Sequence, residues 1–176
     1  MTISNILAIY NLSSAAEIKA GLAWYSDAHN QALQISEALN VPLTTVVGVI
    51  AALSPNNKWE RNLSNAYQLI AAYLDGETVE SVKVSTYHTM KAKAWSILAD
   101  QLDETDDILT RLNGQKIKSF YECIIGLPHG ICIDGHALNI WRNERHGLTS
   151  DKTNIGKRLY ADIQADYLEA GNAVTY

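Results

Sequence analysis

The 176-residue chain contains little of what several protein classes depend on. It has two cysteines, Cys123 and Cys132, which cannot form a disulfide framework and have no His or Cys neighbours at zinc or iron–sulfur spacing. Its longest apolar run, residues 46–53, is too short to cross a bilayer, and the N-terminus lacks the basic-then-apolar layout of an export signal. We therefore expect two buried thiols, no metal, no membrane contact and a cytoplasmic location.

The chain also lacks a net positive charge, which argues against a general affinity for nucleic acid. Its formal net charge is −5, but the distribution is uneven. Residues 1–110 hold six Lys and Arg against twelve Asp and Glu, whereas residues 111–158 hold eight against four. The basic segment indicates either a local patch for phosphates or an ordinary solvated helix surface.

Strand signals are nearly absent as well, whereas helix signals recur along the chain. The length fits one domain, and we find no repeat, low-complexity tract or interdomain linker. The sequence predicts a single all-α domain over residues 1–176, a compact bundle of about seven or eight helices. The predicted helices cover residues 14–40, 43–53, 58–75, 85–98, 105–112, 116–126 and 134–145, with a last one from residue 150.

Several of these helices have a candidate N-cap. Ser14 and Glu17 have the spacing of a capping box, and Asp134 precedes an apolar helix. Asn57, Thr105 and either Ser85 or Thr86 are predicted to cap three others. The apolar helix at residues 43–53 is expected to lie at the centre of the core.

Lys118 and Asp134, sixteen positions apart, carry the best indication of chemistry. Gly114, before Lys118, is predicted to turn the chain with a positive φ. An amine and a carboxylate facing one another across a pocket can cleave a glycosidic bond: the carboxylate stabilises the cationic sugar and the amine attacks its anomeric carbon. Taken singly, Lys118 is equally typical of a solvated helix residue and Asp134 of an ordinary N-cap.

The segment around these residues resembles the helix-hairpin-helix DNA glycosylases of the endonuclease III type. Leu112, Gly114 and Lys118 stand where that family has the Leu, first Gly and catalytic Lys of its hairpin, and residues 133–136 stand where it has Val-Asp-x-His. Residues 51–56, Ala-Ala-Leu-Ser-Pro-Asn, look like the Leu-Leu-Ser-Ala-Gln turn of the same family. The chain is also similar to uncharacterised small phage-type proteins with Ala-Leu-Ser-Pro, Trp-x-x-Asn, Phe-Tyr and Asp-x-His elements.

The resemblance implies a hairpin element over about residues 106–126, with Lys118 as nucleophile and Asp134 as its electrostatic and acid–base partner. It implies substrate or DNA contacts for a further set of residues. For most of them the alternative is a structural role, in core packing or in a turn. They are Ser54, Asn56, Trp59, Asn62, Gly114, Gln115, Lys116, Tyr121 and His136. The hairpin has Gly114-Gln115-Lys116 instead of Gly-Val-Gly, so we expect weak duplex binding.

The resemblance therefore implies a DNA glycosylase-like enzyme, possibly a lyase as well, that acts on DNA or a nucleotide and needs no cofactor. An alternative on the same scaffold is a phage-type enzyme that replaces an activated group on a pyrimidine with an amine, which would work in the host cytoplasm. A third alternative, supported by the acidic net charge and the missing glycine, is a non-catalytic module that binds nucleic acid or protein.

Overall fold

The computed structural model describes residues 2–147 and 155–174, which contain nine α-helices, one 3₁₀-helix and no strand. The predicted all-α class is confirmed. The helices are α1 (Thr2–Leu12), α2 (Ala15–Leu39), α3 (Leu43–Leu53), α4 (Trp59–Leu74), η1 (Val79–Ser81), α5 (His88–Ala99), α6 (Thr105–Arg111), α7 (Gln115–Ile125), α8 (Gly135–Arg142) and α9 (Lys157–Ala173). The sequence prediction omitted α1. The predicted helix start at Ser150 lies outside the described residues.

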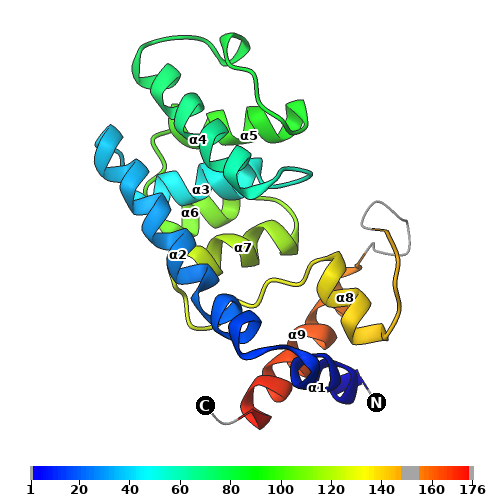
Figure 1. Cartoon of the computed structure of the whole chain (residues 1–176). Coiled ribbons are helices and arrows are strands. Elements are labelled where there is room, and N and C mark those ends of the chain that lie inside the picture. The colour runs from blue at the N-terminus through cyan, green and yellow to red at the C-terminus, as the bar shows by residue number, and fades with distance from the viewer. Residues whose placement is uncertain (1, 148–154, 175–176) are drawn as a thin grey trace. The chain divides into compact units, whose positions relative to one another are not determined.

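The chain divides into two compact units. The central unit comprises residues 25–130, and the terminal unit comprises residues 1–24 together with 131–176. Helix α2 crosses the division, because its first ten residues belong to the terminal unit and the rest to the central unit. Figure 1 shows the elements of each unit in chain order.

The central unit is built around α3. Every residue from Thr45 to Leu53 is buried, and α3 packs against α4, α5, α6 and α7 (Figure 1). A helix that is apolar on all sides can be stable in water only if other helices cover all of it. The prediction that residues 43–53 form the central core helix is therefore confirmed.

Gly48 lets α3 approach its neighbours closely. A Cβ atom at this position would lie 2.9 Å from Cγ2 of Ile108 in α6 and 3.4 Å from Cδ1 of Ile97 in α5. Both isoleucines are fully buried, so neither can move into open space. The absence of a side chain at Gly48 sets how near α5 and α6 lie to α3.

The terminal unit has a smaller core, formed by the buried residues Ile133, Leu138, Tyr160 and Ile163. Polar contacts hold α1 to the rest. The Oδ2 atom of Asp166 accepts hydrogen bonds from Trp141 Nε1 at 2.7 Å and from the hydroxyl of Thr2 at 2.5 Å. Both hydrogen bonds lower the pKa of the Asp166 carboxyl, and the bond from Thr2 has the larger effect.

Two of the predicted helix caps are confirmed. The backbone N–H and hydroxyl of Ser14 donate to Glu17, at 2.8 and 2.7 Å, and the Glu17 N–H donates back to the Ser14 hydroxyl at 3.3 Å. The Asp134 carboxylate accepts from the N–H of Ala137 at 2.9 Å, as an N-cap does. In both cases an acceptor side chain lies next to the first backbone N–H groups of a helix, which have no partner within the helix.

The other predicted caps are wrong, because their side chains bind elsewhere. Helices α4, α5 and α6 begin without a side-chain cap. The Asn57 amide donates to Leu53 O, the Thr86 hydroxyl donates to Pro55 O, and the Thr105 hydroxyl pairs with that of Tyr121. Ser85 is exposed, and its N–H donates to the side chain of Asn65. Tertiary partners replace the local cap at Thr86 and Thr105, whereas Asn57 binds back to the end of α3.

No single helix among the described residues has the length and apolar character needed to cross a bilayer. Helices α2 and α3 would satisfy both criteria together, but they are bent by 118° at the break between them. Cys123 and Cys132 form no disulfide and are only partly buried, so the expectation of buried thiols was wrong in degree.

We expect G48A to destabilise the protein by about 1–3 kcal/mol, because the new methyl group overpacks the contact with Ile108. The opposing gain in helix propensity is only about 1 kcal/mol. Urea denaturation followed by circular dichroism measures the difference. The matched control is G21A in α2, where a Cβ meets nothing within 4 Å and stability should rise slightly. A G48A protein as stable as the G21A protein would contradict this packing argument.

Candidate functional site

The connection between α6 and α7 contains the predicted turn. Gly114 has a φ of 85°, in the region that favours glycine, as predicted, and it precedes the first residue of α7. Leu112 is buried and anchors the connection, whereas Gln115 and Lys116 are exposed in the first turn of α7. The sequence therefore places two exposed polar side chains at a helix N-terminus, where backbone N–H groups also point outward.

Lys118 follows one turn later on α7, half-buried, and has a second lysine as its electrostatic neighbour. Burial, and after it the positive charge of Lys118, lower the pKa of Lys93 on α5. Within residues 2–147 and 155–174, neither ammonium group has an ion-pair or hydrogen-bond partner. Two like charges without a counter-charge raise the free energy of the folded state, and such arrangements are typical of functional sites.

Lys93 was not among the residues that the sequence indicated. It lies 25 positions before Lys118 and belongs to no motif, so nothing in its local sequence distinguishes it from a solvated lysine. The two meet because α5 and α7 both pack against α3. The only available signal would have been a prediction of that helix packing.

Ser54 and Asn56 form the turn between α3 and α4. The Ser54 hydroxyl donates to Ala51 O at 2.9 Å, and Asn56 is exposed with a φ of 53°. The backbone of Asn56 thus adopts the left-handed conformation that asparagine tolerates better than most residues. Its side chain remains accessible, so turn formation and a ligand contact are compatible at this position.

Asn62 lies inside the core of the central unit, 1% exposed. Its Nδ2 donates to the carbonyl of Ile50 at 3.0 Å, while its Oδ1 is buried and has no donor among the described residues. Asn57 shows the same pattern, with its amide on Leu53 O and its own Oδ1 unpaired there. Both amides therefore satisfy carbonyls in the last turn of α3, which favours a structural role.

Trp59 packs in the same unit. Its Nε1 donates to the side chain of Gln31 at 2.9 Å, and its ring makes an edge contact with Phe120, with centroids 6.3 Å apart. Tyr121 is fully buried, and its hydroxyl lies 3.2 Å from that of Thr105. For both aromatic residues the structure shows the packing that was the alternative to ligand binding.

Asp134 and His136 lie at the start of α8 in the terminal unit. Asp134 is half-buried, and its Oδ1 accepts one hydrogen bond, from Ala137 N–H. Tyr167 of α9 lies close enough that the Asp134 charge, after burial, raises the pKa of its phenol. His136 is exposed, and no hydrogen bond joins it to Asp134 within the described residues.

Lys118 and Asp134 therefore belong to different units of the chain. Within its unit, Lys118 is brought next to Lys93. Within its own, Asp134 is brought next to Tyr167. The sequence singled out neither neighbour.

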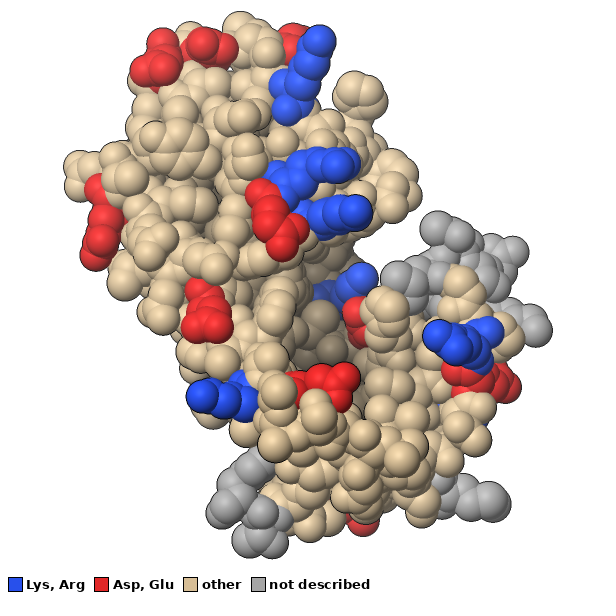
Figure 2. Space-filling view, viewed as in Figure 1, with Lys and Arg blue, Asp and Glu red and all other residues tan. Residues whose placement is uncertain are grey.

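The charged side chains of the central unit are also unevenly spread. Figure 2 shows several Lys and Arg side chains gathered along one edge of the face in view, with some Asp and Glu side chains among them and others toward the opposite edge. In the described part of the chain, no group of three His, Cys, Asp or Glu side chains is placed to hold a metal ion.

The chain belongs to a family of unknown function, DUF7178, whose model spans residues 1–176. No curated protein matches the chain. No solved structure matches it either.

We expect N62D to destabilise the protein more than N62A, which should cost about 1–3 kcal/mol by leaving Ile50 O unpaired. The introduced carboxylate would face that carbonyl without a proton to donate. Burial raises the pKa of such a carboxyl, so the penalty should be small in acid and grow as pH rises above about 4. Urea titrations at several pH values test this, with N30D at an exposed site of α2 as control. A pH-independent difference between N62D and wild type would contradict it.

K118M should raise the pKa of Lys93, because it removes the second cause of the lowered value and leaves the burial. A lowered lysine pKa opposes folding while the amine is protonated, and this effect is relieved as pH rises through the folded-state pKa. K118M should therefore stabilise the protein at neutral pH, by less than about 1 kcal/mol because the lysines are partly exposed. NMR titration of the lysine side chains measures the pKa.

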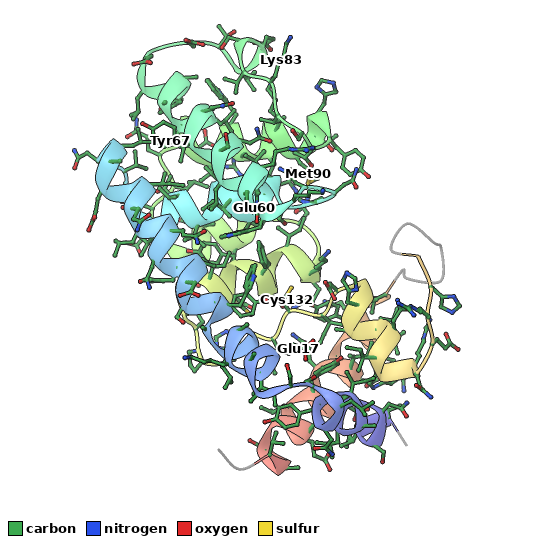
Figure 3. The ribbon with its side chains drawn as sticks, in the orientation of Figure 1. Glu17, Glu60, Tyr67, Lys83, Met90 and Cys132 are labelled. Carbon is green, nitrogen blue, oxygen red and sulfur yellow. The ribbon has the colours of Figure 1, made fainter. Side chains whose placement is uncertain are left out.

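The matched control is K83M, at an exposed lysine of the same unit that is labelled in Figure 3. It removes the same charge from an exposed position outside α5 and α7. Equal effects of K118M and K83M on the pKa of Lys93 would show that the two lysines are not neighbours.

Proposed function

We propose that the protein is a DNA glycosylase-like enzyme that acts at the N-glycosidic bond of a nucleobase, with an associated lyase step. Lys118 is the nucleophile and Asp134 is the electrostatic and acid–base partner. The substrate is DNA or a nucleotide, the reaction needs no cofactor, and the protein works in the cytoplasm.

One observation carries the proposal: Lys118 is a half-buried amine with another ammonium group nearby and, in the described residues, no carboxylate partner. An amine attacks carbon through its free electron pair, and a lysine without an ion-pair partner in the described residues can turn its Nζ toward a substrate. A lysine kept for stability or solubility would be expected to lie near an acid or in open solvent. This arrangement costs stability and supports chemistry.

The chemistry follows from the two groups. As the bond between the base and C1′ breaks, the base leaves with the bonding electron pair and the sugar becomes cationic. The Asp134 carboxylate stabilises that cation. The neutral Nζ of Lys118 then forms a bond to C1′ and loses a proton. Ring opening gives a Schiff base, and loss of the 3′-phosphate by elimination constitutes the lyase step.

The remaining residues are assigned by their exposure. Gln115 and Lys116, exposed beside Gly114, contact a phosphate at the N-terminal end of α7. Ser54 and the exposed Asn56 contact the substrate at the α3–α4 turn, and His136 contacts it at the start of α8. Trp59, Asn62 and Tyr121 act from inside the central unit by holding these elements in place. Without a second hairpin glycine, we expect duplex binding to be weak.

A second candidate is replacement of an activated group on a pyrimidine by an amine. The specific observation in its favour is the Lys93–Lys118 pair. Two ammonium groups stabilise an anionic leaving group more than they stabilise a neutral one. In this reaction the sugar–phosphate strand stays whole, which distinguishes it from glycosylase and lyase activity.

The decisive experiment incubates the protein with DNA that carries a panel of damaged or hypermodified bases. Mass spectrometry detects released base or altered strand mass, and borohydride traps a Schiff base as a covalent adduct. We expect wild type to release a base and form the adduct. K118A and K118R should form no adduct, and D134N should lower the rate by roughly a hundredfold or more. K83A is the matched lysine control and should behave as wild type.

Altered base mass without strand cleavage or adduct would favour the amine-transfer reaction. If no substrate in the panel changes and K118A is indistinguishable from wild type, the enzyme proposal fails and a binding module is favoured. The salt dependence of DNA retention then separates the two kinds of module, since phosphate binding weakens steeply as salt rises.

A further inference from the structure

The chain has no regular secondary structure over residues 131–134, just before α8 begins at Gly135. This segment contains Asp134, and Figure 3 labels Cys132 within it. The geometry of an irregular segment depends on the groups that bind its backbone. Three of those contacts come from one face of α9.

Three polar side chains of α9 reach this backbone. The Nε2 of Gln164 donates to Ile131 O at 2.7 Å. The hydroxyl of Tyr160 accepts from the N–H of Ile133 at 2.8 Å, in a fully buried position. These two bonds fix the chain on the N-terminal side of Asp134.

The third contact lies on the other side of Asp134. The hydroxyl of Tyr167 donates to Ala137 O at 2.9 Å. The N–H of the same residue, Ala137, donates to the Asp134 carboxylate at 2.9 Å. Tyr167 thus holds the residue that in turn holds the catalytic candidate.

Tyr160, Gln164 and Tyr167 are spaced by four and three residues, so they lie on one face of α9. The same helix face also carries Ile163, which is fully buried in the core. An apolar side chain at each of the three positions would pack against that core without needing any particular backbone position. Polar groups, in contrast, bind only where a backbone donor or acceptor meets them.

We propose that Tyr160, Gln164 and Tyr167 are positioning residues that hold the Asp134 carboxylate in its working orientation. The proposal deepens the glycosylase-like function above and rests on it for the role of Asp134. None of the three touches the substrate. Their contribution is to fix Ile131, Ile133 and Ala137, and through them the direction of a carboxylate that has one hydrogen bond within the described chain.

Burial, and next the Asp134 charge, raise the pKa of Tyr167, so its phenol remains protonated at neutral pH and continues to donate to Ala137. Among the described residues, Asp134 is the charged group that acts on this phenol. The positioning contact is therefore stable over the pH range in which Asp134 is ionised.

The test uses the full-length chain and an observable that needs no substrate. Because Ala137 N–H binds the Asp134 carboxylate, its amide NMR signal should shift as that carboxyl titrates, and D134N should abolish the shift. We expect Y160F, Q164L and Y167F each to reduce the amplitude of this titration, measured well below the melting temperature. Y67F, at an exposed tyrosine of α4 labelled in Figure 3, is the matched control and should leave it unchanged.

Full-amplitude titration of Ala137 in all three variants would overturn the proposal, even if their melting temperatures fall, because it would mean that α9 only stabilises the fold. The catalytic arm uses whichever panel DNA wild type converts. There, Y167F should lower the single-turnover rate by roughly ten- to a hundredfold with little change in KM. The positioning proposal would also be overturned if Y167F reduced the amplitude of the Ala137 titration and left the single-turnover rate unchanged.

Failure of the proposed function looks different. If D134N and K118A convert or bind every probe as wild type does, the glycosylase assignment falls while the Ala137 titration still reports whether α9 orients the carboxylate.

Discussion

The burial of α3 is the constraint on which the central unit depends. A helix that is apolar on every side must be covered on every side, and α4, α5, α6 and α7 provide that cover. Covering a helix this completely leaves the carbonyls of its last turn away from water. The side-chain amides of Asn57 and Asn62 donate hydrogen bonds to two of these carbonyls, Leu53 O and Ile50 O. The same cover brings α5 and α7 near enough for the charge of Lys118 to contribute to the lowered pKa of Lys93.

The terminal unit solves a different problem, because its apolar core is small. Hydrogen bonds between segments far apart in the chain make up for this. Asp166 joins α9 to Trp141 and Thr2, and Tyr160, Gln164 and Tyr167 join α9 to the segment that leads into α8. Helix α9 thus organises the unit through polar groups, whereas α3 organises the central unit through apolar ones.

Local sequence was sufficient for features whose cause is local. The all-α class, the span of α3, the Ser14 capping box, the Asp134 cap and the positive φ of Gly114 all follow from residues within a few positions of one another. The cap predictions at Thr105 and at Ser85 or Thr86 were wrong because partners distant in the chain bind these residues instead, and the one at Asn57 was wrong because its amide turns back to Leu53 O in the preceding helix. Lys93 and Tyr167 were missed for the same reason: each is informative only through a neighbour on another helix.

The hydrogen bonds on Asp166 make the attachment of α1 sensitive to acid. Their lowering of the pKa of this carboxyl means that they stabilise the terminal unit above the carboxyl's ordinary value and that this contribution disappears as pH falls through the lowered one. The hydrogen bonds that the side-chain amides of Asn57 and Asn62 donate to backbone carbonyls involve no ionisable group, so acid does not weaken these bonds directly. Acid well below the ordinary pKa of an aspartate therefore weakens the hydrogen bonds through which Asp166 holds Thr2 of α1 and Trp141 of α8.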